Sequence, residues 1–135
     1  MLEDYNQAIR LDPNLADAYF NRGTARNFVI DKQGALEDYN QAIRLDPNLA
    51  DAYCNRGIIR DLLRDKQGAL EDYNQAIRLN PNFAEAYFNR GNVRDLLRDK
   101  QGAIADWQQA AKLFEQQGDP VLYQHAMDSI AQLQQ

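Results

Sequence analysis

Apolar residues recur along this chain with the period of an α-helix. The clearest run has apolar positions at i, i+1, i+4, i+7 and i+8, which are Ala35, Leu36, Tyr39, Ala42 and Ile43. Such spacing places them on one helical face. Asp31 predicts the N-cap of this helix, and Pro47 predicts its end because proline lacks an amide proton and disfavours helical dihedrals at Asp46. No stretch alternates with period two for long enough to form a strand, so the sequence predicts an all-α fold.

Another helix is predicted before each of these runs. In the first case it begins near Asn14 and continues to about Ile30. Asn14 followed by Asp17 resembles a capping box, and Asn82 with Glu85 is the closest match to that pattern. The predicted unit is therefore a pair of helices joined by a turn.

This two-helix pattern returns every 34 residues. Residues 2–19 and 36–53 are identical, and residues 14–47 match residues 48–81 at 26 of 34 positions. A helix pair cannot bury its apolar faces alone, so neighbouring units are expected to stack around a shared core. The predicted organisation is a second helix of a truncated unit, three full units and a capping helix, at residues 1–13, 14–47, 48–81, 82–117 and 118–135.

The predicted first segment has an apolar face without a partner helix, formed by Leu2, Tyr5, Ala8 and Ile9. Terminal repeats usually carry a polar outer face. One expectation is therefore that these four residues mediate self-association into a homo-oligomer. The alternative is that the face is tolerated in a monomer.

The repeated unit resembles the tetratricopeptide repeat (TPR). The resemblance rests on an aromatic residue, a glycine four residues later, two alanines around a second aromatic residue, and a terminal proline. In the first full unit these are Tyr19, Gly23, Ala35, Tyr39, Ala42 and Pro47. The third unit has Trp107 as its second aromatic residue and Glu115 in place of the proline. The resemblance implies a right-handed α-solenoid whose first helices line a concave groove, and the Asn-Arg-Gly triplets resemble those of a subgroup.

Arginines depart from the family pattern. Arg22, Arg56 and Arg90 stand where the family usually has an aliphatic residue, and Arg26, Arg60 and Arg94 where it usually has an aromatic one. The members of each pair are four residues apart and share a helix face. Since that face meets the second helix, we expect ion pairs with Asp38, Asp72 and Asp106. Alternatively, the arginine stems pack while the guanidinium groups reach water. The turn, usually Gly-Asp in the family, reads Ile30-Asp31, Arg64-Asp65 and Arg98-Asp99.

Composition excludes several functional classes. The net charge of -5 disfavours binding to nucleic acid or to anionic lipid, since both need a basic surface. Single copies of cysteine (Cys54) and histidine (His125) exclude an intrachain disulfide and a Cys/His metal cluster. The sequence contains no Gly-rich phosphate loop, no membrane-spanning apolar run and no signal-peptide pattern. We therefore expect a non-catalytic cytoplasmic protein without cofactor or metal.

The resemblance implies a peptide-binding stripe on the first helices. Its residues are Asp17, Phe20, Asn21, Thr24, Asn27, Phe28, Asp51, Cys54, Asn55, Ile58, Asp61, Leu62, Glu85, Phe88, Asn89, Asn92, Asp95 and Leu96. One asparagine per unit (Asn21, Asn55, Asn89) could bind the backbone of a peptide, or could instead bond a neighbouring helix.

The stripe contains five acidic and no basic residues. Some relatives bind acidic chaperone tails through a basic clamp, whose positions are occupied here by Asp17, Phe20 and Glu85. The expected partner is therefore a protein segment, extended or helical, with basic residues among apolar ones.

Overall fold

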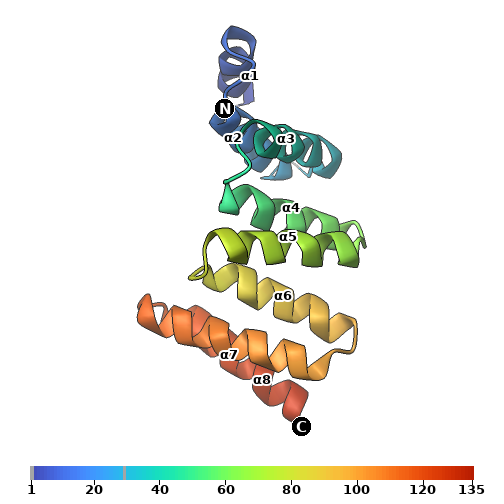
Figure 1. The fold of residues 1–135 in the computed structure, drawn as a ribbon, viewed down its shortest axis with the longest axis vertical. Coiled ribbons are helices and arrows are strands. Elements are labelled where there is room, and N and C mark those ends of the chain that lie inside the picture. The colour runs from blue at the N-terminus through green and yellow to red at the C-terminus, as the bar shows by residue number, and fades with distance from the viewer. Residues whose placement is uncertain (1, 29) are drawn as a thin grey trace. The chain divides into compact units, whose positions relative to one another are not determined.

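The protein is described by a computed structural model that covers residues 2–28 and 30–135, without the side chain of Phe28. The described residues form eight α-helices and no strand, as the hydrophobic periodicity predicted (Figure 1). The chain divides into two compact units, Met1–Asp72 and Tyr73–Gln135. The boundary falls inside a helix.

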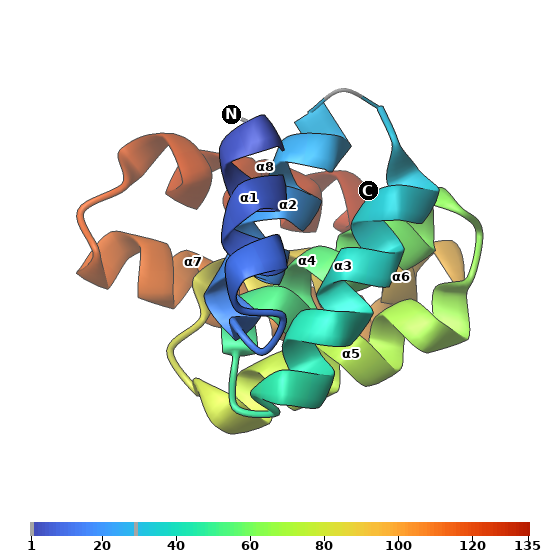
Figure 2. The same ribbon diagram turned by 90° about the horizontal axis from the view of Figure 1, so that it is seen from above.

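The first unit contains α1 (Leu2–Leu11), α2 (Ala16–Phe28), α3 (Lys32–Leu45), α4 (Ala50–Leu62) and the first half of α5 (Lys66–Leu79). α2 packs against α1 and α3, and α3 also packs against α4 (Figures 1 and 2). Ala35, Tyr39 and Ile59 form a buried cluster, with Phe20 and Leu36 packed at its edge. The helical period predicted Ala35, Leu36 and Tyr39 on one packing face, whereas Phe20 was expected in the binding stripe.

The second unit contains the rest of α5 with α6 (Ala84–Leu96), α7 (Lys100–Gln116) and α8 (Pro120–Gln134). α7 packs against both α6 and α8, so the last helix covers the outer side of α7 as expected for a capping helix (Figure 1). One cluster centres on Phe114 with Leu122 and Tyr123 at its edge. The other joins Trp107 to Ile130. The capping helix thus buries apolar surface that α7 would otherwise expose.

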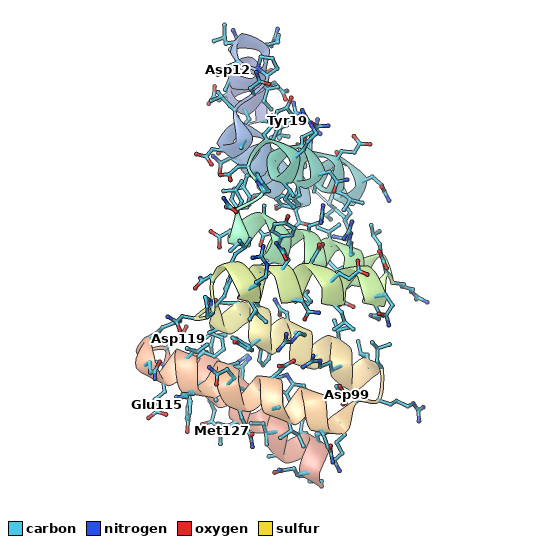
Figure 3. All side chains as sticks on the ribbon, in the orientation of Figure 1. Asp12, Tyr19, Asp99, Glu115, Asp119 and Met127 are labelled. Atoms are coloured by element: carbon cyan, nitrogen blue, oxygen red, sulfur yellow. The ribbon has the colours of Figure 1, made fainter. Side chains whose placement is uncertain are left out.

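Aspartate side chains cap the starts of the second helices. The carboxylate of Asp31 accepts a hydrogen bond from the backbone N–H of Gly34 at 2.9 Å, as predicted. Asp99 caps α7 in the same way, and Asp119 caps α8 (Figure 3). A Cβ atom at Gly34 would lie 2.3 Å from Asp31 Oδ2. A side chain at this position would therefore require the Asp31 carboxylate to shift.

The asparagine cap predicted at Asn82 is wrong, and α4 begins in the same way as α6. The N-cap residues of these helices are Leu49 and Phe83, and neither side chain accepts a capping hydrogen bond. Instead, Asp46 Oδ1 accepts from the N–H of Asn48 at 3.1 Å. Such a bond closes an Asx-turn around the intervening proline. The side-chain hydrogen bond before α4 is consequently made by Asp46, about one turn ahead of the helix, and not by the N-cap residue.

The turn between first and second helices forces three ordinary residues into the left-handed region. Ile30, Arg64 and Arg98 have φ values of 62°, 69° and 66°. Only glycine adopts this conformation without steric cost. The turns that depart from the family's Gly-Asp sequence therefore carry backbone strain.

The predicted arginine–aspartate pairs are confirmed. Arg56 donates from Nε and Nη2 to the two oxygens of Asp72, at 2.9 and 2.7 Å, and Arg60 Nη1 lies 3.1 Å from Asp72 Oδ2. Asp72 is only 1% exposed. The same pairing occurs at Asp38 and Asp106. Bidentate bonds to two cations keep these buried carboxylates satisfied.

Each central arginine also connects three helices. Arg56 Nη1 donates to Asn40 Oδ1 on α3 at 2.9 Å, while its other nitrogens bind α5. Its guanidinium carbon lies 5.4 Å from the ring centroid of Tyr53, within cation–π range. Arg22 donates in the same way to Asn6, and Arg90 to Asn74. The Asn–Arg–Asp arrangement therefore fixes each first helix against the second helices on both sides of it.

Candidate interaction surface on the first helices

The predicted stripe lies on α2, α4 and α6, and its members differ in exposure. The exposed members are four acids, one asparagine and two leucines, namely Asp17, Asp51, Glu85, Asp95, Asn21, Leu62 and Leu96. The half-buried members are Phe20, Thr24, Asn27, Asn55, Ile58, Asp61, Phe88, Asn89 and Asn92. Cys54 is only 3% exposed and offers a partner almost no surface. The side chain of Phe28 lies outside the described residues.

Several half-buried members hold helices together. Thr24 Oγ1 lies 2.9 Å from Tyr39 Oη, and Asn55 also hydrogen-bonds Tyr39. Burial raises the pKa of Tyr39, while the bonds to Thr24 and Asn55 act in the opposite direction. For Asn55, bonding to a neighbouring helix is thus the arrangement found. Asn21, which is exposed, keeps its amide available to a partner.

The charge of the surface is modified by one neighbouring lysine. Lys66 Nζ forms an ion pair with Asp61 Oδ1. This pair joins the end of α4 to the start of α5, five residues away across the turn, which the helical face pattern did not reveal. Asp17, Asp51 and Glu85 stand at the exposed beginnings of their helices. The acidic character of the stripe is therefore strongest at these first turns.

A depression of about 240 Å³ lies between α6, α7 and α8. It is lined by Asn92, Asp95, Trp107, Ser129, Gln132 and Leu133. The sequence placed Asn92 and Asp95 in the binding stripe and treated residues 118–135 only as a capping helix. Ser129 and Gln132 are three residues apart and therefore lie on one face of the capping helix. This polar spacing is the feature of the sequence that could have indicated a contribution of α8 to a site.

The described part of the chain holds no group of three or more His, Cys, Asp or Glu side chains arranged to bind a metal ion. His125 is exposed on α8. No described helix is both long and apolar enough to span a membrane.

The four residues expected to mediate self-association lie on α1. Leu2, Tyr5, Ala8 and Ile9 are each half-buried, and the described part of α1 has no fully buried residue. α1 packs against α2. Part of its apolar surface therefore remains exposed in the single chain.

Comparisons with known proteins agree with this architecture. A family model described as TPR repeat matches residues 2–26, 33–60 and 66–94. A search of curated proteins found no significant match. Among solved structures, the chain is similar to the TPR2B domain of yeast Sti1 in a complex with pHsp70, with 20% identity over 88% of this chain and 95% of that one and a TM-score of 0.83.

Two further structures are similar in fold. The first TPR of Spaghetti (RPAP3), bound to the HSP90 peptide SRMEEVD, is 21% identical over 88% of this chain and 90% of that one, with a TM-score of 0.79. MamA is 22% identical over 98% of this chain and 84% of that one, with a TM-score of 0.77. Since the family model matches more than half of the residues, the chain belongs to the TPR repeat family and has its all-α helical solenoid fold.

Proposed function

We propose that this chain is a non-catalytic protein-interaction module that binds a peptide segment, extended or helical, on the first helices of its repeats. One observation carries the proposal: α2, α4 and α6 each present an exposed acid in their first turn. Leu62 and Leu96, at 55% and 61% exposure, add apolar surface at the far ends of α4 and α6. Similar folds occur in TPR domains that carry pHsp70 or an HSP90 peptide. We assign the module to the cytoplasm, as the sequence predicts.

The charge of these helices selects a basic partner. The peptide SRMEEVD, bound by the Spaghetti domain, has three acidic side chains and one basic one. In this chain, Asp17, Asp51 and Glu85 would repel such a segment. A segment with lysine or arginine among apolar residues would instead pair with the acids and cover the exposed leucines. We therefore infer a partner of opposite charge to the chaperone tail.

Binding to a peptide array tests this function. Peptides with alternating basic and apolar residues should bind, while SRMEEVD should not, and the affinity of the best binder should fall as salt concentration rises. The double variant Asp17→Lys/Asp51→Lys should weaken that binder by at least about tenfold, because two attractive charges become repulsive. Isothermal titration calorimetry measures both effects.

A matched control changes the same charge elsewhere. Glu37→Lys/Glu71→Lys alters two exposed acids on the second helices, outside the proposed surface. This variant should keep the affinity of the parent protein within about twofold. Equal losses in both double variants would show that net charge alone attracts the peptide, and would contradict a site on the first helices.

A second candidate function is self-assembly through α1. It is favoured by the half-buried Leu2, Tyr5, Ala8 and Ile9. Light scattering across a concentration series should then show a mass above that of the 15.5 kDa monomer, and Tyr5→Glu should restore the monomer. A strictly monomeric mass at every concentration would exclude this candidate.

A further inference from the structure

We propose that the depression between α6, α7 and α8 binds one basic side chain, arginine or lysine, of the partner segment. The inference rests on the proposed function and adds to it a specific subsite. All six lining residues belong to the second unit. The capping helix is thereby given a part in recognition besides its role in covering α7.

The lining matches the two parts of a long basic side chain. Leu133, which is half-buried, supplies apolar surface for the aliphatic stem, and the 3% exposed Trp107 forms the floor of the depression. Asp95 is the charged residue of the lining, and it is exposed. Its carboxylate can accept charge-assisted hydrogen bonds from an ammonium or guanidinium group. A neutral apolar side chain would leave that carboxylate without compensation as it lost water.

Hydrogen bonds orient the polar lining toward an incoming ligand. Trp107 Nε1 donates to Asn92 Oδ1 at 3.1 Å and to the carbonyl of Phe88 at 3.3 Å. An indole nitrogen only donates, so the Asn92 atom facing it must be the carbonyl oxygen, and the NH₂ group remains free to bind a peptide carbonyl. Ser129 Oγ donates to the His125 carbonyl at 3.0 Å, which leaves its lone pairs as acceptors.

The equivalent position in the preceding repeat differs in one decisive respect. There, Asp61 is neutralised by Lys66. Lys100 stands at the same offset from Asp95, yet among the described residues no ion pair joins these two side chains. Asp95 is also the position that faces a capping helix, through Ser129 and Gln132. The charge of Asp95 is consequently available to a ligand, whereas the charge of Asp61 is compensated by Lys66.

The chain contains a built-in reporter for this site, since Trp107 is its one tryptophan. The probes are acetyl-Ala-Arg-Ala-amide, its lysine counterpart, and its citrulline counterpart, which keeps the shape of arginine without the charge. The indole N–H resonance of Trp107 should shift saturably with the basic probes. The citrulline peptide should bind about tenfold more weakly or not at all. A comparison of the arginine and lysine probes shows which head group is preferred.

Two variants complete the test. Asp95→Asn should weaken the basic probes by about tenfold, whereas Asp128→Asn, which removes an exposed carboxylate on α8 outside the lining, should leave them unchanged. Equal binding of citrulline, an unchanged affinity in Asp95→Asn, or no saturable shift up to the solubility limit would overturn the proposal. If array peptides bind while Asp95→Asn has no effect, only the subsite fails. If the probes bind while no array peptide does, the proposed function fails.

Discussion

At the scale of single residues, buried charge distinguishes this chain from an ordinary helical core. Asp38, Asp72 and Asp106 are at most 3% exposed, and each is bound by two arginines. Removal of one partner from such a group costs more than the pair contributes, because the remaining charge is left in a poorly solvated place. Loss of either partner should therefore be costly even if the intact pair contributes little to stability.

A double-mutant cycle on Arg56 and Asp72 measures this coupling. Arg56→Met should cost roughly 3 kcal/mol, since it leaves the 1% exposed Asp72 with Arg60 alone. Asp72→Asn should cost less, because the arginine heads are partly exposed and can turn to water. The double variant should be less destabilised than the sum by about 1–3 kcal/mol. Urea denaturation gives all four free energies, and additive costs would show that the pair is not coupled.

The left-handed residue Arg64 offers a prediction of opposite sign. With a φ of 69°, Arg64 carries strain that glycine would not. Arg64→Gly should stabilise the protein by roughly 0.5–1 kcal/mol, a gain reduced by the greater freedom of glycine in the unfolded chain. As a control, Arg44→Gly in the last turn of α3 should destabilise it by about 1 kcal/mol. Thermal unfolding that shifts both variants in the same direction would contradict this explanation of the turn.

At the scale of helices, close approach depends on small residues whose demands differ between repeats. A Cβ at Gly91 would lie 2.6 Å from Trp107 Nε1, whereas one at Gly23 would lie 3.1 Å from Tyr39 Cε1. Gly91→Ala should therefore force α6 away from α7 and cost roughly 1–3 kcal/mol, with a clearly smaller cost for Gly23→Ala. Chemical denaturation of the two variants compares the same substitution at the same repeat position. A larger cost at Gly23 would contradict the ranking.

The sequence predicted the helices well because their apolar period, aspartate caps and prolines are local features. It also predicted the arginine–aspartate pairs, since spacing of four residues fixes a shared face. The asparagine cap at Asn82 failed because the N-cap position of α6 falls one residue later, at Phe83, while the N–H of Asn82 itself donates to Asn80 Oδ1. The subsite was missed for another reason: Asn92 and Ser129 come from helices α6 and α8, and their meeting depends on tertiary packing that no local pattern encodes.

At the scale of the whole molecule, the Asn–Arg–Asp arrangement would let a second copy of a repeat be placed directly after the first with the same bonds. Arg56 binds Asn40 and Asp72, and Arg90 binds Asn74 and Asp106, each with the same sequence spacing of 16 on either side. An extra copy of residues 48–81, inserted after Pro81, would therefore find an asparagine before it and supply one to the repeat after it. No existing ion pair would be broken.

Insertion of that copy should stabilise the chain, because each repeat adds its own stability and one more interface. Thirty-four additional residues at the usual stability per residue give a gain of roughly 2–5 kcal/mol, and the urea m-value should rise by about a quarter. The control is the same insertion with Asp→Asn at the position of the copy that corresponds to Asp72, which should gain markedly less. If both insertions give the same midpoint and free energy of unfolding, the ion pairs do not couple neighbouring repeats, and the apolar contacts alone would account for the stacking.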